Sequence, residues 1–217
     1  MAGRAHVSGT CTRLHALCSS LPSYGFPFDR AALPHNGIYV LYEAGEGGHG
    51  GPRIVRIGTH TGQNQFPSRL EQHFLKENKD RSIFRKNIGR ALLARDEDPF
   101  LSQWELDLTT SAARAAYGQL IDGDKQLKVE RRVSAYLRRA FTFVVFRIDG
   151  KEERLRLESR MISTVSLCNE CGPSASWLGL QSPKEAIRQS GLWLVNELYK
   201  EPLAPEDLAL LARAGQE

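Results

Sequence analysis

Two short stretches of the sequence decide the fold. The first, Gly37-Ile38-Tyr39-Val40-Leu41-Tyr42, is rich in β-branched and aromatic residues, which favour strands. The second, Arg53-Ile54-Val55-Arg56-Ile57, has the same character and is closed by Gly58. The segment 43–52 between them contains five glycines. Two short strands joined by a glycine-rich turn predict a β-hairpin.

The rest of the chain adds one clear strand and several helices. Residues 141–146 are nearly continuously apolar, which predicts a central strand. A short strand is expected at 104–108. Hydrophobic periodicity and start signals predict helices near 12–19, 68–77, 82–95, 125–139, 150–167, 182–189, 192–199 and 204–214. Asp149 and Glu152 have the spacing of a capping box at the start of the 150–167 helix. These elements predict an α/β fold, a small central antiparallel sheet of about three strands flanked by helices, with a helical insertion and a helical C-terminus.

Composition narrows the class of protein. The 217 residues are 41% hydrophobic and 25% charged, which is ordinary for a soluble globular domain and too apolar for a disordered chain. No run approaches the roughly 18 apolar residues of a membrane span. Residues 1–22 lack the continuous apolar core of a signal peptide, so a cytoplasmic protein is expected. The net charge of +4 permits a nucleic-acid partner without requiring one.

The four cysteines leave two interpretations open. In a reducing compartment each cysteine is by default a free thiol. Cys168 and Cys171 form a C-x-x-C pair, which can hold half of a zinc site. The other half would have to come from Cys11 and Cys18, whose six-residue gap is wide for a zinc knuckle.

Glu158 conflicts with the pattern of its own helix. Leu155, Leu157, Met161 and Ile162 trace an apolar stripe over 150–167, and Glu158 falls inside it. A carboxylate in such a position is costly unless a cation or hydrogen-bond donors meet it. It is either half of a buried ion pair, with Arg154 four residues earlier as partner, or a ligand of a hard divalent cation.

Four other residues are candidates whose default interpretation is structural. Arg69 and His73 are four residues apart and share one helix face, which is either a solvated polar face or a phosphate clamp with a proton donor or acceptor beside it. Arg56 interrupts an apolar strand and could face solvent from a sheet edge. Tyr39 is by default a core tyrosine.

The order of these residues resembles a known superfamily. Gly37-Ile38-Tyr39, then Arg56-Ile57-Gly58, then Arg69 with His73, then Leu157-Glu158 with Met161-Ile162, is similar to the motif order of the GIY-YIG nucleases over roughly residues 37–179. The resemblance implies a nuclease domain at 37–180 with an insertion at about 75–140. An N-terminal arm (1–36) and a C-terminal helical extension packed on the same domain (181–217) would flank it.

The resemblance also implies a chemistry. It makes the chain a divalent-metal-dependent endonuclease that hydrolyses DNA phosphodiester bonds, with Mg²⁺ or Mn²⁺ held by Glu158. Arg69 would stabilise charge on phosphorus. Tyr39 or His73 would act as the base on the attacking water, and His73 would otherwise relay the proton or hold the Tyr39 hydroxyl. One departure stands out, because Arg56 occupies the position where the second motif normally has tyrosine. His60, Tyr42 or another group would then take that part, or arginine is tolerated, or activity is reduced.

The DNA partner would be held by basic side chains of two helices, which would give affinity and a salt dependence. The residues expected to contact nucleic acid are Arg85, Lys86, Arg90, Lys128, Arg131 and Arg132; a merely solvated face is the alternative for such charge runs. A catalytically weak or inactive nucleic-acid-binding module of the same fold is the second hypothesis. An unrelated α/β protein, or a zinc-dependent structural module using Cys168 and Cys171, is the third. A compact nuclease with one metal site is also compatible with a homodimer that cuts both strands.

Overall fold

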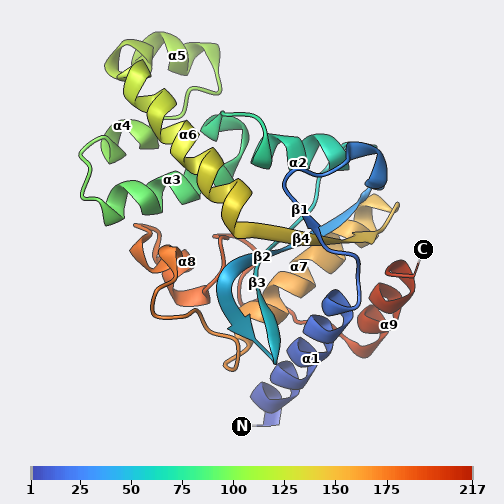
Figure 1. Cartoon of the computed structure of the whole chain (residues 1–217). Coiled ribbons are helices and arrows are strands. Elements are labelled where there is room, and N and C mark those ends of the chain that lie inside the picture. The colour runs from blue at the N-terminus through green and yellow to red at the C-terminus, as the bar shows by residue number, and fades with distance from the viewer. Residues whose placement is uncertain (1, 217) are drawn as a thin grey trace.

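A four-stranded antiparallel sheet organises the chain. The computed structural model describes residues 2–216. The strands are β1 (Tyr24–Gly25), β2 (Gly37–Gly48), β3 (Gly51–Gly58) and β4 (Phe141–Arg147), in the spatial order β1-β4-β2-β3 (Figure 1). The hairpin of β2 and β3 and the inner position of β4 confirm the predicted sheet, and the two-residue edge strand β1 is an addition to it. β3 is the other edge, which leaves its far side open to contacts from helices.

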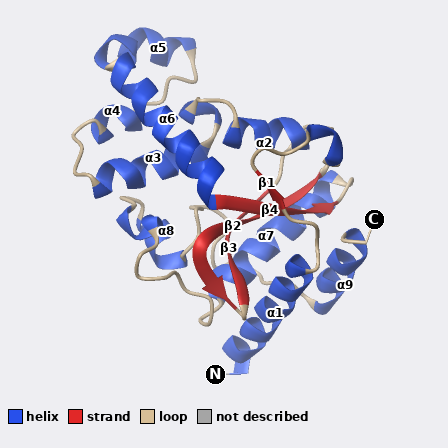
Figure 2. Ribbon diagram, viewed as in Figure 1, coloured by secondary structure: helices blue, strands red, loops and turns tan. Residues whose placement is uncertain are grey.

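Helices cover both faces of the sheet (Figure 2). The helices packed on one face are α2 (Phe66–Phe74), α3 (Ile83–Arg95), α4 (Leu101–Glu105), α6 (Gly123–Ala140) and α8 (Glu185–Ser190). On the other face lie α1 (Ala2–Ser19), α7 (Lys151–Leu167) and α9 (Pro205–Ala214). Helix α5 (Ser111–Tyr117) precedes α6 and stands at its far end in Figure 1. The chain is therefore a three-layer α/β fold.

Alternation along β2 separates the two cores. Tyr39 and Leu41 belong to the hydrophobic cluster shared with α2, α3 and α6. Ile38 and Val40 belong to the cluster shared with α1, α7 and α9. This is the period of two that a strand buried on both faces requires. The C-terminal segment joins both clusters, since Trp193 lies in the first and Leu203 in the second.

A β-bulge in the hairpin redirects one arginine. Leu41 pairs with Arg56 but the next residue, Tyr42, pairs with Ile54, so Val55 is the extra residue. Both Val55 and the Arg56 guanidinium then lie on the α3 side, Val55 in its hydrophobic cluster and Arg56 over the ring of Phe84 at 4.9 Å. Bulges commonly re-aim side chains next to functional sites.

Several local predictions were wrong. Residues 101–105 form helix α4 rather than part of a strand at 104–108, and 192–199 contains turns rather than a helix. Helix α1 is longer than expected and covers half of the N-terminal arm. The start of α7 has Gly150 as its N-cap with no side-chain cap, so the predicted capping box is absent there.

No helix within residues 2–216 is both long enough and apolar enough to cross a membrane.

One buried carboxylate fastens the C-terminal segment to the sheet. Oε2 of Glu43, on β2, accepts hydrogen bonds from the indole N–H groups of Trp177 and Trp193, each at 2.8 Å. Tyr136 on α6 donates its hydroxyl to the other oxygen. These bonds fix the loop that carries Trp193 beside β3, where the candidate site lies.

Candidate active site

The candidate site lies where the edge strand β3 ends. Tyr39 on β2 pairs with Gly58, the last residue of β3. A Cβ atom at position 58 would lie 2.2 Å from the Tyr39 hydroxyl oxygen, so only glycine lets the phenol cross its neighbour strand. The glycine of the second motif thus positions the tyrosine of the first.

Tyr39 begins a buried hydrogen-bonded chain. Its hydroxyl lies 2.8 Å from Nε2 of His73, and Nδ1 of His73 lies 2.6 Å from Oγ of Ser82. His73 is on α2, and Ser82 is the N-cap of α3, where it accepts the backbone N–H of Arg85. Sequence reasoning paired Tyr39 with His73 but missed Ser82, although a serine just before a helical run is an N-cap signal.

His73 is held in its neutral form. Burial lowers its pKa well below the usual value of 6.5, and the neighbouring guanidinium groups of Arg69, Arg56 and Arg85 lower it further. A neutral imidazole has one N–H donor and one acceptor nitrogen. His73 can therefore receive the phenol's hydrogen bond while donating to Ser82, or the reverse, and it is a poor site for a full proton.

Arg56 is a core residue in this structure. Its guanidinium donates to the carbonyl oxygen of Trp193 at 2.5 Å and from Nε to the Tyr39 hydroxyl at 3.4 Å. The residue is only 4% exposed, so the solvent-facing alternative is wrong. A permanent cation thus lies beside the phenol where the family pattern has a second tyrosine. Tyr42, a candidate replacement, lies in the opposite hydrophobic cluster.

Glu158 reaches this edge from the other layer. It projects from α7, and its Oε1 accepts the backbone N–H of Thr59 at 2.9 Å. Thr59 is itself fixed by a 2.6 Å bond from its hydroxyl to the carbonyl of Gly37. The two short motifs of the hairpin and helix α7 therefore meet at Thr59.

Glu158 is not half of a salt bridge. Among the described residues no cation lies within ion-pair distance of it, and no hydrogen bond reaches its Oε2. Arg154 instead donates to the carbonyl oxygens of Ile148 and Asp149, so the ion-pair interpretation is wrong. Burial raises the pKa of Glu158, while the charge of Arg56 and the Thr59 N–H lower it.

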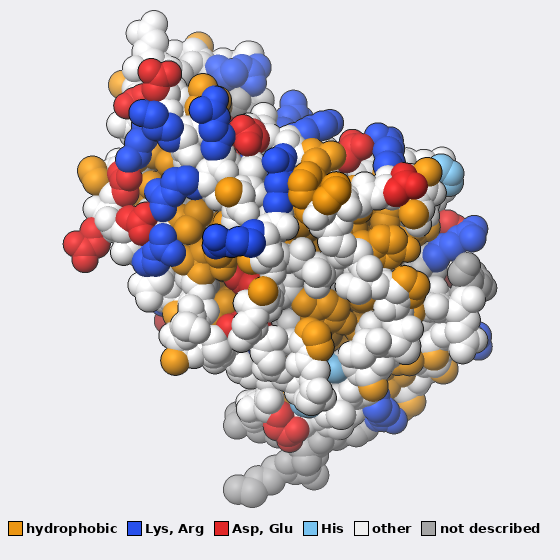
Figure 3. Space-filling model, viewed as in Figure 1, with side chains coloured by type: hydrophobic (Ala, Val, Ile, Leu, Met, Phe, Trp, Pro, Cys, Tyr) orange, Lys and Arg blue, Asp and Glu red, His pale blue; other side chains and the backbone are white. Residues whose placement is uncertain are grey.

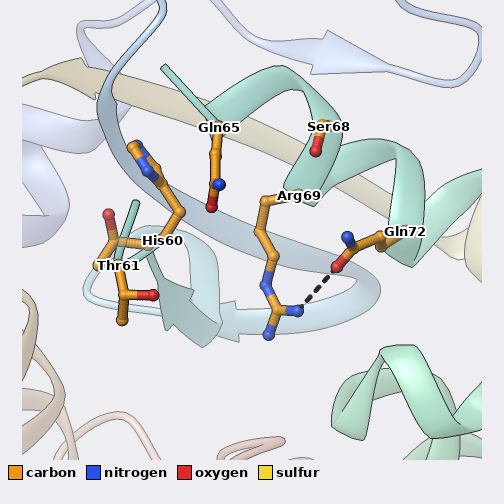
Figure 4. A pocket seen from close by; sticks show the side chains of 7 residues that line it. His60, Thr61, Gln65, Ser68, Arg69 and Gln72 are labelled. Carbon is orange, nitrogen blue, oxygen red and sulfur yellow. Dashed lines mark hydrogen bonds between the residues drawn. The ribbon is translucent and has the colours of Figure 1, made fainter. Parts of the chain in front are cut away.

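A cleft of about 260 Å³ opens in front of Thr59. It is lined by residues of the segment after β3 and of α2: Thr59, His60, Thr61, Gln65, Ser68, Arg69 and Gln72 (Figure 4). Arg69 extends from α2 into this space, held by a 3.1 Å bond to Gln72 and a 3.3 Å bond to the carbonyl of Arg81. His60 bonds the carbonyl of Gly62 through Nδ1 and leaves its buried Nε2 without a partner. The cleft can accept an anion beside Arg69.

Three basic residues expected to contact nucleic acid are interior instead. Arg85 is fully buried and ion-paired with Glu130 at 2.7 Å. Lys86 donates to the carbonyl of Glu105, and Arg90 makes a two-pronged contact with the Glu105 carboxylate. Helix α3 is packed on several sides, so these three basic side chains have their partners within the protein. Their assignment to a DNA surface is corrected accordingly.

The basic residues of α6 do face outward. Lys128, Arg131 and Arg132 are exposed, although Arg132 is paired with Asp96. Lys and Arg side chains gather over α5 and α6 on the face shown in Figure 3. This face is electrostatically suited to a polyanion.

The cysteines form a cluster that differs from the expected one. Cys11, Cys168 and Cys171 come together with His49, and their ligand atoms all lie within 4.8 Å of one another. Cys18 belongs elsewhere, buried beside Tyr42. The predicted C-x-x-C half-site therefore has Cys11 and a histidine as its partners, not Cys11 and Cys18.

Comparison with known proteins agrees with the geometry. No curated protein and no solved structure matches the chain. A family model described as GIY-YIG domain matches residues 27–217, which include strands β2, β3 and β4, the Tyr39 chain, the cleft and Glu158. This is a nuclease family whose members generally use a divalent metal and act on nucleic acid. The chain belongs to the GIY-YIG domain family.

Proposed function

We propose that this chain is a divalent-metal-dependent endonuclease that hydrolyses DNA phosphodiester bonds at the cleft between β3 and α2. The observation that carries the proposal is Glu158. Its carboxylate has one oxygen fixed by Thr59 and the other free of partners among the described residues. Cations from Arg56 and Arg69 act on its pKa. A half-buried acid without a salt bridge, beside a cleft that Arg69 lines, is a functional-site signal.

The donor set suits a hard cation. Carboxylate oxygen is the ligand that Mg²⁺ and Mn²⁺ prefer, with water and substrate oxygens completing the shell. Oε2 of Glu158 would hold the ion. When bound, such an ion would stabilise charge on the phosphate and the leaving oxygen as a Lewis acid.

The protein's own groups would position the substrate. Arg69 offers a planar, always charged fork for the nonbridging phosphate oxygens, and its bonds to Gln72 and Arg81 set the direction of that fork. The Tyr39 hydroxyl would orient the attacking water. His73, neutral and buried, would hold the phenol by accepting or donating one hydrogen bond. Tyr39 is therefore favoured over His73 as the group that contacts the attacking water.

A cleavage assay tests the proposal. Supercoiled plasmid and defined duplex, nicked and branched DNA would be incubated with the purified chain and Mg²⁺ or Mn²⁺. We expect metal-dependent nicking, reduced by at least about 100-fold in Glu158→Gln. Glu152→Gln is the matched control, because Glu152 is exposed on the same helix. Nicking that survives Glu158→Gln unchanged would overturn the metal assignment.

One observation favours a second function, a nucleic-acid-binding module that does not cut. Tyr39 is fully buried, and Arg56 covers its hydroxyl while bound to Trp193. If the phenol stays covered in this way when DNA is bound, it cannot contact the attacking water. Binding of DNA with no cleavage under any metal condition would support this function and exclude the endonuclease.

A further inference from the structure

We propose that Cys11, His49, Cys168 and Cys171 form a structural zinc site that is separate from the Glu158 site. The four residues come from three parts of the chain: α1, the turn between β2 and β3, and the loop that follows α7. The family match begins at residue 27, so Cys11 lies before the matched region. The site would join α1 to the nuclease domain.

The distances have the scale of a tetrahedral site. The sulfurs of Cys11 and Cys171 are 3.6 Å apart, and the sulfur of Cys168 is 3.3 Å from Nε2 of His49. With Zn–S bonds of about 2.3 Å, two sulfurs on a tetrahedral ion are about 3.7 Å apart. The ligand atoms therefore surround a space of the right size for one ion.

Neighbouring groups hold the histidine in the ligating form. Nδ1 of His49 lies 2.9 Å from Oγ1 of Thr12, whose own hydroxyl donates to the carbonyl of Ser8. The Thr12 oxygen is then the acceptor, so Nδ1 carries the proton and the Nε2 lone pair faces the sulfurs. A ligating histidine usually has such an outer hydrogen bond.

The backbone is also shaped around the site. His49 has a φ of +51°, an unusual conformation for a residue other than glycine. A Cβ at Gly48 would lie 3.0 Å from the Cβ of Cys171, so glycine permits the close approach of the loop. The backbone N–H of Glu170 lies 3.4 Å from the sulfur of Cys168, a donor that stabilises a thiolate.

The donor set identifies the ion and its role. Three thiolates and one imidazole are soft and borderline ligands that suit Zn²⁺, not Mg²⁺. Four protein ligands leave no open position, which is typical of a structural site. Binding converts three thiols to thiolates and releases three protons, with no electron transfer.

The position of the site relates it to the rest of the fold. Cys168 ends α7, ten residues and about 15 Å along the helix from Glu158. His49 lies at the tip of the hairpin whose other end carries Thr59. The ion would tie together the two elements that meet at the Glu158–Thr59 bond, and it would hold α1 against both.

Metal analysis of the full-length protein tests the site. We expect about one zinc per chain after purification, and substitution by Co²⁺ should give the intense absorption of a tetrahedral, thiolate-bound ion. Cys168→Ser should lose the zinc, whereas Cys18→Ser, a buried cysteine outside the cluster, should keep it. Glu158→Gln should also keep it, which separates this site from the proposed catalytic one.

A second variant avoids the risk that loss of a ligand prevents folding. Thr12→Val removes only the outer hydrogen bond to His49 and should weaken zinc affinity roughly 10- to 100-fold. Folded wild-type protein that contains no zinc and gives no tetrahedral Co²⁺ spectrum would overturn the proposal. So would a disulfide between two of the three cluster cysteines, shown by an intact mass two hydrogens lower than the reduced chain in both the wild type and Cys18→Ser.

Discussion

Oε1 of Glu158 accepts the backbone N–H of Thr59 at 2.9 Å, and this bond joins helix α7 to the end of the edge strand β3 across two layers of the fold. The carboxyl is half-buried, and this burial raises its pKa above the ordinary value of 4.5. Arg56 and the Thr59 N–H act in the opposite direction without cancelling that shift. The folded protein therefore holds a carboxylate that is costly to ionise.

The first prediction concerns stability against pH. Because the pKa of Glu158 is raised on folding, the folded state binds its proton more tightly than the unfolded state, and this carboxyl makes stability fall as pH rises above about 4.5. Glu158→Gln cannot ionise and should lose that part of the dependence. The free energy of unfolding of the variant minus that of the wild type, measured by urea denaturation without added divalent metal, should increase from pH 4.5 to pH 8.

Glu43 and Glu130 also have raised pKa values, but both are present in each protein and cancel in the difference. Glu152→Gln should show a flat difference, since that side chain is exposed. A difference for Glu158→Gln that decreases with pH would contradict the raised pKa of Glu158.

The second prediction concerns His73. Its folded pKa is well below 6.5, so as pH falls through about 6.5 the unfolded chain takes up a proton that the folded chain does not. His73 therefore makes stability fall on acidification. His73→Gln should reduce the loss of unfolding free energy between pH 7.5 and pH 5, measured by chemical denaturation. His35→Gln, at an exposed position, should leave the loss unchanged, and an equal loss in His73→Gln would show that His73 is protonated in the fold.

Local pattern and motif order in the sequence were sufficient to predict where the hairpin, Glu158 and the Tyr39–His73 pair lie. The hairpin followed from two apolar runs around a glycine-rich turn, and Glu158 stood out because it broke a helical stripe. The Tyr39–His73 pair followed from a resemblance in motif order. None of these needs knowledge of which surfaces pack together.

Tertiary packing decided the rest. Charge counting assigned Arg85 to a surface because its partner, Glu130, is 45 residues away on another helix. Cys11 and Cys18 lie on one helix, and seven residues separate them by about 10 Å along its axis, too far to share one ion. His49 completes the cluster only because the hairpin turn brings it to α1 and the loop after α7.

The third prediction concerns Arg56. Its charge lowers the pKa of Glu158, and Glu158 must be ionised to hold a cation. Arg56→Met keeps bulk over the Phe84 ring but removes the charge, so the pH at which cleavage reaches half its maximum should rise. The measurement is the initial nicking rate against pH at saturating Mg²⁺. Arg131→Met, an exposed residue of α6, should leave this midpoint in place, and a midpoint that falls in Arg56→Met would contradict the electrostatic coupling.

The fourth prediction concerns the α6 surface. If Lys128 and Arg131 contact phosphates, each contributes to the release of counterions, and log K falls with log[salt] by about 0.9 per contact on duplex DNA. Lys128→Ala combined with Arg131→Ala should therefore reduce the magnitude of the salt slope by about 2, measured by fluorescence anisotropy over a range of NaCl concentrations. Arg213→Ala combined with Lys151→Ala removes the same charge from exposed positions on the other layer, in α9 and α7, and should leave the slope nearly unchanged. Equal slopes for the two double variants would mean that DNA affinity depends only on the net charge of the protein. The basic side chains of α6 would then form a solvated face without phosphate contacts.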